Sequence, residues 1–405
     1  MTASSQLENI LESHERETVL RLLAAAAFLI FVQAYLVAPL IPAYMKEFHA
    51  SDRVVGLLVP AYLLPYGFCT LFYGPISDRI GRRPVLLSMI AAIALATLAT
   101  SLAPSLRALL ALRVAAGVAS GGIIPISLAL LGDLFSYQQI GRAIGWIFGA
   151  IAGGMAFGST FGALLNPIIG WRMEFAIVGI LFAAVLAIAY PHRALLEGRR
   201  SKHPPGIGAA LRSYLALFTN RRGRTAYSCV FVNAIFHSGV FSWLGFYFSR
   251  RYGLGDRGIG LALLGYGVPG MLLGPTIGHI ADRFGRNRLI PAGLLVSALS
   301  AAALAPHVPL AIAVVVITTL SLGLDMSHPP LSGIITSLDP NRRGQALGLN
   351  AFLLFTGMGS GALLFQLLLT SSLATALTTF AAAELLLALL AVRFFRHEKR
   401  PTGAS

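Results

Sequence analysis

The sequence predicts an all-α integral membrane protein, and three observations support that fold class. Apolar residues make up 56% of the 405 residues while only 12% carry a charge, whereas an ordinary soluble domain has about a quarter of its residues charged. The apolar residues gather in long charge-poor stretches, as membrane helices of about 20 residues require. No stretch alternates apolar and polar residues as a membrane strand does. A water-soluble protein is therefore excluded.

Twelve charge-poor stretches account for most of the apolar residues, and we expect each to form one transmembrane helix. They lie near residues 19–41, 55–76, 84–103, 108–131, 143–165, 173–190, 226–248, 259–280, 289–305, 310–333, 345–369 and 373–395. Residues 1–18 are rich in Glu and contain no small-residue cleavage site behind an apolar stretch, so they do not resemble a secretory signal. We expect them to remain as a cytoplasmic segment, with residues 397–405 as a cytoplasmic tail.

The net charge of +15 is distributed unevenly. With the N-terminus in the cytoplasm, most Lys and Arg residues fall in cytoplasmic segments, which is the positive-inside pattern of a multi-pass protein in the cell (inner or plasma) membrane. The largest basic cluster lies in residues 193–224, together with Pro204, Pro205 and Gly206, and predicts a cytoplasmic linker that faces anionic lipid. The lipid bilayer, rather than nucleic acid, is therefore the expected partner of the basic residues.

The linker separates two halves that repeat one another. A shift of 204 residues, from Gly74 to Gly278, also superposes Tyr62 on Tyr266 and Pro65 on Pro269. We infer two duplicated six-helix bundles, residues 19–192 and 225–396. Repeats of this kind flank a central site in many secondary transporters.

The loop after the second predicted helix contains the most specific part of the repeat. Its residues are Gly74, Asp78, Arg79, Gly81 and Arg82, and its copy contains Gly278, Asp282, Arg283, Gly285 and Arg286. Gly74 lets a neighbouring helix approach and Gly81 permits a tight reversal. The arginines anchor the turn at the cytoplasmic face, and Asp78 needs a positive partner at that depth.

These two loops resemble the signature loop of the major facilitator superfamily, with Ile76 and Ile280 at the usual Leu. Leu109, Arg113 and Gly117 are similar to the family's fourth-helix motif, although Ala116 replaces a frequent Gln. The resemblance covers the whole chain and implies the major facilitator fold, in the type of the twelve-helix drug:proton antiporters and sugar-efflux proteins. It implies that the Asp78 loop contacts the start of the eleventh helix in the outward-facing state. It also implies that the Asp282 loop contacts the fifth helix.

Two rows of glycines at four-residue spacing mark the fifth predicted helix, Gly141, Gly145, Gly149 and Gly153 and then Gly154, Gly158 and Gly162. Small residues let helices pack closely. The resemblance implies that this helix packs against the eighth across the interface of the halves, where Gly270, Gly274 and Gly278 form a matching row. The glycines also resemble the family's antiporter motif, with Ser159 at the motif's proline and Ala163 at its last glycine.

Ionisable residues at membrane depth mark functional sites, because they are costly there. They are Arg113, His237, Asp325, His328 and Glu384. Asp325 and His328 lie one turn apart, before Pro329 and Pro330 interrupt the helix and free backbone carbonyls. We predict that Asp325 binds a proton in one conformation and releases it in the other, as His237, His328 or Arg113 approaches or withdraws.

Several of these residues also have structural interpretations. His237 is also explained as a neutral histidine that hydrogen-bonds to another helix, and Arg113 as a partner for a backbone carbonyl or for Asp325. For Glu384 we favour a structural role, because the family places the twelfth helix at the lipid-facing periphery. Asn233, Gln33, Tyr62 and Tyr266 supply polar groups to a substrate cavity, or pack without a function.

The sequence contains no pattern for a cofactor, a metal or an enzyme. No Gly-Lys pair and no His-Glu-x-x-His occur, and Cys69 and Cys229 fall in separate predicted helices as core residues. We therefore expect a monomeric transporter that uses the proton gradient and alternating access to export a small, partly apolar compound, such as a drug, metabolite or sugar-like molecule. Proton-coupled import of a small solute is the alternative. A membrane-embedded enzyme or a transport-dead sensor is more remote.

Overall fold

The computed structural model describes residues 3–136, 139–198, 206–266, 285–339 and 342–398. Every regular element within these ranges is helical, and ten helices are long and apolar enough to cross a membrane. The predicted all-α membrane class is confirmed.

The first half of the chain contains eleven helical elements among the described residues. They are α1 (Ala3–Leu36), η1 (Ala38–Leu40), α2 (Ile41–Glu47), α3 (Asp52–Val55), η2 (Gly56–Leu58), α4 (Pro60–Ile80), α5 (Arg82–Ser101), α6 (Leu106–Ser120), α7 (Ile123–Leu134), α8 (Ile140–Ala189) and η3 (Leu195–Glu197). The second half contains α9 (Ile207–Thr219), α10 (Arg221–Ser242), α11 (Leu244–Tyr252), α13 (Arg286–Leu304), α14 (Leu310–Thr336), α15 (Arg343–Leu369) and α16 (Leu373–Phe394). Residues 256–266 form the described part of the eighth span.

The predicted spans differ from the observed helices at a few boundaries. The first helix begins at Ala3 instead of residue 19. The fifth and sixth spans are joined in α8, where Gly170 adopts a positive φ of 75° that reverses the chain. The linker predicted at residues 193–224 contains the helix α9, and α10 already begins at Arg221.

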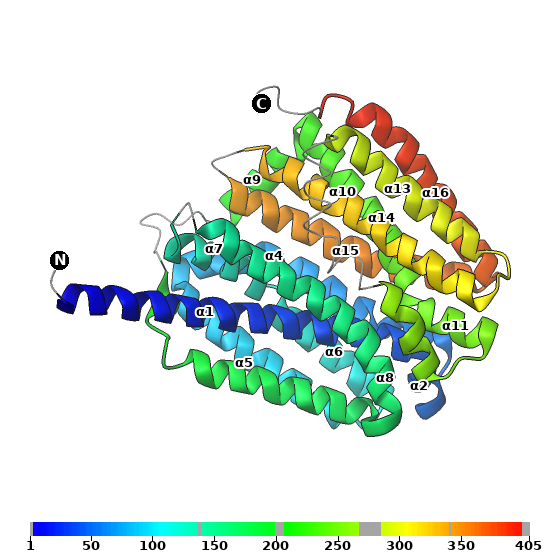
Figure 1. The fold of residues 1–405 in the computed structure, drawn as a ribbon, viewed down its shortest axis with the longest axis horizontal. Coiled ribbons are helices and arrows are strands. Elements are labelled where there is room, and N and C mark those ends of the chain that lie inside the picture. The colour runs from blue at the N-terminus through cyan, green and yellow to red at the C-terminus, as the bar shows by residue number, and fades with distance from the viewer. Residues whose placement is uncertain (1–2, 137–138, 199–205, 267–284, 340–341, 399–405) are drawn as a thin grey trace.

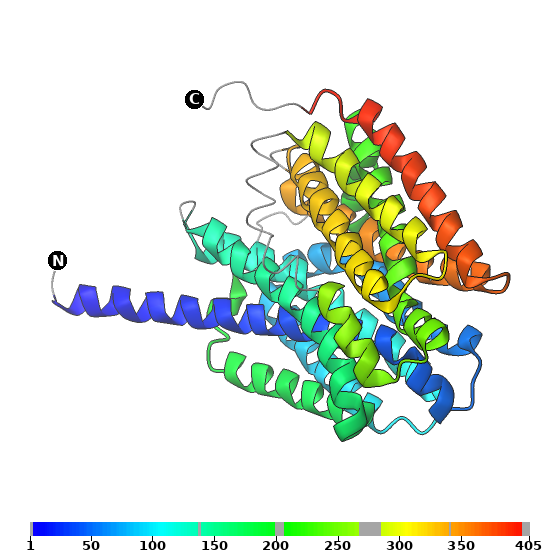
Figure 2. The same ribbon diagram turned by 45° about the vertical axis from the view of Figure 1, so that its right-hand side comes forward.

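The two halves lie side by side, and α1 begins at the end of the molecule at which α16 ends (Figures 1 and 2). We call this the terminal end, where Ile80, Leu134, Ala189, Arg221 and Thr336 bound their helices. The opposite, distal end is bounded by Leu36, Ser101, Gly170, Tyr252 and Leu369. The helices alternate between these ends, as spans joined by short loops do.

The predicted tight reversals occur at matching positions of the repeat. Gly81 precedes α5 with a φ of 101°, and Gly285 precedes α13 with a φ of 88°. Side chains with a Cβ rarely adopt this backbone conformation. The packing role expected for Gly74 has no counterpart among the described residues, because a Cβ there meets no described atom within 4 Å.

The glycines of α8 pack against α1, a partner that the sequence did not indicate. A Cβ added at Gly154, Gly158 or Gly162 would collide with Phe28, Val32 or Leu36, respectively. The first row is more open, since a Cβ at Gly145 meets no described atom within 4 Å. Gly270, Gly274 and Gly278 lie outside the described residues. Close approach to the eighth span is nevertheless present at Gly260, where a Cβ would lie 2.8 Å from Leu164 Cγ.

Substitution of Gly158 by Ala is expected to lower stability by about 1–3 kcal/mol, as overpacking of a tight interface does. The new methyl group would press on the backbone of Val32, which cannot rotate away as a side chain can. Gly149→Ala is the matched control, because no described atom lies within 4 Å of its Cβ position. Thermal unfolding of the detergent-solubilised variants measures the difference. Equal transition temperatures would contradict the packing role of Gly158.

Candidate functional site

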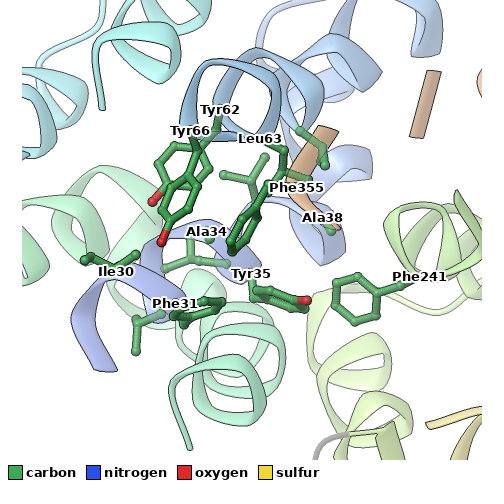
Figure 3. Packing of buried hydrophobic residues seen from close by; sticks show 14 of the residues in the cluster. Ile30, Phe31, Ala34, Tyr35, Ala38, Tyr62, Leu63, Tyr66, Phe241 and Phe355 are labelled. Atoms are coloured by element: carbon green, nitrogen blue, oxygen red, sulfur yellow. The ribbon is translucent and has the colours of Figure 1, made fainter. Parts of the chain in front are cut away.

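Aromatic side chains from both halves meet at the centre of the molecule. The central aromatic cluster consists of Phe31, Tyr35 and Tyr66 from the first half and Phe241, Tyr266 and Phe355 from the second. The rings of Tyr66 and Phe355 are 4.0 Å apart, and those of Tyr35 and Phe241 are 5.0 Å apart. Figure 3 shows most of these rings converging from α1, α4, α10 and α15. The cluster offers apolar surfaces edged by phenol groups, as small-molecule sites do.

A polar layer lies within the second half, on helices α10, α13 and α14. The Ser297 hydroxyl lies 3.1 Å from His237 Nε2, and Asn233 Nδ2 donates to Ser327 Oγ over 3.0 Å. His237 Nδ1 is buried and has no hydrogen-bond partner among the described residues. His237 is thus bonded to a neighbouring helix, as its structural interpretation predicted, and it also retains one uncommitted ring nitrogen in the described part of the structure.

Asp325 lies on α14 beside the central aromatic cluster. Its Oδ2 atom is buried and lacks a hydrogen-bond partner among the described side chains and backbone. The carboxyl is within electrostatic reach of the Tyr266 side chain. His328, one turn further along α14, is within electrostatic reach of the His237 ring. A charge without a partner is costly at this depth. Asp325 is therefore a buried acidic group whose Oδ2 atom has no described partner.

Arg113 is bound inside the first half instead. Its Nε donates to the Leu58 carbonyl over 3.3 Å and its Nη1 to the Gln33 carbonyl over 3.1 Å. Its guanidinium carbon lies 4.3 Å from the centre of the Tyr62 ring, a cation–π contact. These contacts fit the structural interpretation with carbonyl partners. None of the described contacts joins Arg113 to Asp325.

Gln33 and Tyr62 tie further helices into the same unit. The Thr97 hydroxyl donates to Gln33 Oε1 over 2.8 Å, and the Tyr62 hydroxyl donates to Ser120 Oγ over 2.9 Å. Helices α1, α4, α5 and α6 thus share one buried polar network around Arg113.

The signature loop forms ion pairs within its own half. Arg82 pairs with Asp133 at the end of α7, and Arg83 lies 3.3 Å from Glu197. Arg79 lies near Gly206, and Asp78 is within electrostatic reach of Tyr214 on α9.

The copy of this loop in the second half is described only in part. A Cβ at Gly333 of α14 would meet the Arg286 guanidinium at 3.0 Å, so Arg286 lies against α14, the second-half equivalent of α7. Gly278, Asp282 and Arg283 lie outside the described residues.

Two further carboxyl groups are buried. Glu384 is 0% exposed on the inward face of α16, whereas Leu386 and Leu389 of the same helix are 58% and 63% exposed, as a helix at the periphery requires. Glu174 of α8 is 4% exposed and was not among the predicted site residues. Neither carboxyl has a hydrogen-bond partner among the described residues. Glu174 follows Arg172 at the edge of its span, so the charge pattern resembles a solvated turn, and only the fold places it next to Tyr44.

The two halves are joined at the distal end. Asn166 Nδ2 donates to Asp256 Oδ2 over 2.7 Å, and Gln366 Nε2 donates to the Arg53 carbonyl. A Cβ at Gly245 would lie 2.8 Å from the Pro39 carbonyl oxygen, so α11 packs tightly on η1. These contacts hold the distal ends of the halves together.

Asn166→Ala is expected to weaken this closure and raise the distal-open population by roughly tenfold, since a hydrogen bond to a charged group contributes about 1.5 kcal/mol or more. Asn166 and Asp256 both line a distal hollow of about 980 Å³. A cysteine introduced at Ala38, which is 2% exposed in this closed arrangement, reports opening by its rate of maleimide labelling in a chain whose Cys69 and Cys229 are replaced by Ser. Asn220→Ala at the start of α10 is the control. An unchanged labelling rate would show that this bond does not hold the halves together.

Two similar helical halves, joined around a central aromatic and polar site, define the class of membrane transporters built from repeats. Residues 23–362 and 248–405 match the family described as the Major Facilitator Superfamily, and the chain belongs to this family. The predicted family resemblance is confirmed. Transporters of this family bind small-molecule substrates and typically work as monomers, and the protein is a membrane transporter and not an enzyme.

The similar proteins agree with this assignment. The uncharacterized MFS-type transporter YceJ of Bacillus subtilis is 27% identical over 337 residues, 82% of this chain and 85% of that protein. Multidrug resistance protein D of Escherichia coli is 30% identical over 185 residues, 45% of each chain. The crystal structure of a bacterial homolog of the human lysosomal transporter Spinster, inward-facing and unoccupied, has a TM-score of 0.76 at 18% identity and covers 96% of this chain and 99% of its own.

Proposed function

We propose that the protein is a secondary active transporter that exports a small, partly apolar compound in exchange for protons. The observation that carries this proposal is the Asp325 carboxyl, whose buried Oδ2 lacks a partner among the described residues beside the central aromatic cluster. Aromatic rings suit an apolar compound, and a membrane-embedded carboxyl suits a proton. The name of multidrug resistance protein D supports export.

The proposed cycle is alternating access between the two halves. The positive-inside pattern favours both termini in the cytoplasm, which makes the distal end the outer one. The contacts of Asn166 with Asp256 and of Gln366 with Arg53 then close the outer side. Protonation of Asp325 from the outer side would follow once the distal contacts open.

The test uses inverted membrane vesicles whose lumen is acidified by respiration and followed with a pH-sensitive dye. A panel of lipophilic cations, neutral drugs and small sugars is added outside the vesicles. Acid leaving the lumen on addition of a compound establishes exchange and therefore export. Vesicles without the protein are the control.

Proton-coupled import remains the alternative, since Ser159 and Ala163 depart from the antiporter pattern. Proton-coupled import predicts that protons leave the lumen only when the compound is loaded inside the vesicles. A compound that raises the unfolding temperature but moves no acid in either arrangement would favour a sensor and would overturn the proposal of transport by proton exchange.

A further inference from the structure

The linker helix α9 has a buried face and an exposed apolar face. The buried face consists of Ala210, Tyr214 and Leu217, which pack in one hydrophobic cluster with residues of α10 and α15. The opposite face exposes 42% of Leu211 and 62% of Leu215, and Arg212 is exposed beside them. Exposed leucines next to an arginine are typical of a helix that lies in the plane of a membrane surface.

The charged residues in the chain segment around α9 are all basic, and of the acidic groups that the fold brings close, Asp78 lies by Tyr214 on the buried face and Glu398 pairs with Arg222. No acidic residue occurs between Glu197 and Asp256, while Arg221 and Arg224 are exposed directly after α9. Clusters of basic residues next to a membrane span bind anionic lipid. This complementarity identifies an anionic membrane leaflet as the partner of the exposed face, defined by Leu211, Arg212 and Leu215.

The buried face of α9 reaches the interface between the two halves. Along that interface α4 and α15 touch directly at Leu64 and Gly359, at Gly67 and Thr356, and at Phe68 and Phe352. Nearer the terminal end, Tyr214 lies between the same two helices. Its hydroxyl donates to the Leu71 carbonyl of α4 over 3.3 Å. The same hydroxyl lies 3.6 Å from the position that a Cβ atom would take if Gly348 of α15 carried one.

The Tyr214 hydroxyl is suited to this position. Burial raises the pKa of the phenol and the neighbouring Asp78 carboxyl raises it further, so the group keeps its proton and remains a donor. Leu71 of the first half packs against the same hydrophobic cluster that contains Tyr214. For α4 and α15 to meet at the terminal end, Tyr214 has to leave the space between them.

We propose that the exposed face of α9 binds the anionic lipid leaflet and thereby holds Tyr214 as a wedge between α4 and α15. Anionic lipid then stabilises the conformation that is open at the terminal end. The lipid contact changes the balance between conformations, whichever direction transport takes and whatever the role of Asp325.

The test measures the distance between spin labels at the terminal ends of the two halves. Labels are attached to Ser136→Cys and Ser337→Cys, both exposed, in a full-length chain whose Cys69 and Cys229 are replaced by Ser. The protein is reconstituted in vesicles of phosphatidylcholine, with and without phosphatidylglycerol. We expect phosphatidylglycerol to increase the long-distance population. Arg212→Gln should reduce that lipid effect about fivefold, from roughly 1 kcal/mol per surface arginine.

Two further variants separate the wedge from its lipid contact. Tyr214→Ala should shift the labels to short distances in both vesicles, whereas Arg257→Gln, the same charge change on an exposed distal residue, should respond to lipid as the parent does. Gel filtration confirms that each variant is folded. Identical distance distributions in the two vesicles would overturn the lipid contact, and an unchanged distribution in Tyr214→Ala would overturn the wedge.

Discussion

Asp325→Asn is expected to abolish proton-driven transport while the protein stays folded. Asn has nearly the shape of Asp but carries no exchangeable acid proton at neutral pH, so proton movement can no longer be tied to the cycle. The buried Oδ2 has no partner among the described residues, so the amide breaks no described hydrogen bond at that atom. The acid signal from inverted vesicles should fall to the level of vesicles without the protein.

Substrate counterflow without a pH gradient distinguishes loss of coupling from loss of the transporter. We expect counterflow to persist in Asp325→Asn, because exchange of labelled for unlabelled compound needs no net proton movement. Glu384→Gln is the matched control, since Glu384 is also a buried carboxyl without a partner among the described residues. Coupled transport that survives Asp325→Asn and disappears in Glu384→Gln would move the coupling site to α16.

The membrane spans were the most predictable part of the fold, because lipid requires long apolar helices. The reversals at Gly81 and Gly285 could also be predicted, since glycine favours their positive φ. The helix α9 was missed because Pro204, Pro205 and Gly206 precede it and indicate a loop. Its apolar spacing at Ala210, Tyr214 and Leu217 was the available signal, but the basic residues around it obscured that pattern.

The residues of the candidate site could be predicted better than their contacts with one another. Asp325 and His237 were identified by the cost of placing them in lipid, but periodicity does not say which helices face one another. For that reason the sequence left Arg113 open between a carbonyl and Asp325, and only the fold joins it to Leu58 and Gln33. The same limit applies to Gly158, whose partner Val32 lies on α1.

Arg113→Leu is expected to lose on the order of 3 kcal/mol of stability, because it removes hydrogen bonds that a charged group makes to two buried carbonyls. Arg113 is 1% exposed, so water cannot replace those bonds. The loss also removes the contact with the Tyr62 ring that joins α6 to α4. Thermal unfolding in detergent should show a clearly lower transition temperature than that of the parent protein.

Arg113→Lys separates this structural role from a role in proton coupling. Lysine keeps the charge but lacks the planar fork that reaches both Leu58 and Gln33. A structural Arg113 therefore predicts an intermediate transition temperature and coupled transport in proportion to the folded protein. A coupling Arg113 predicts near-parental stability together with a changed pH dependence of transport, because the charge beside the central site would then determine when the proton leaves.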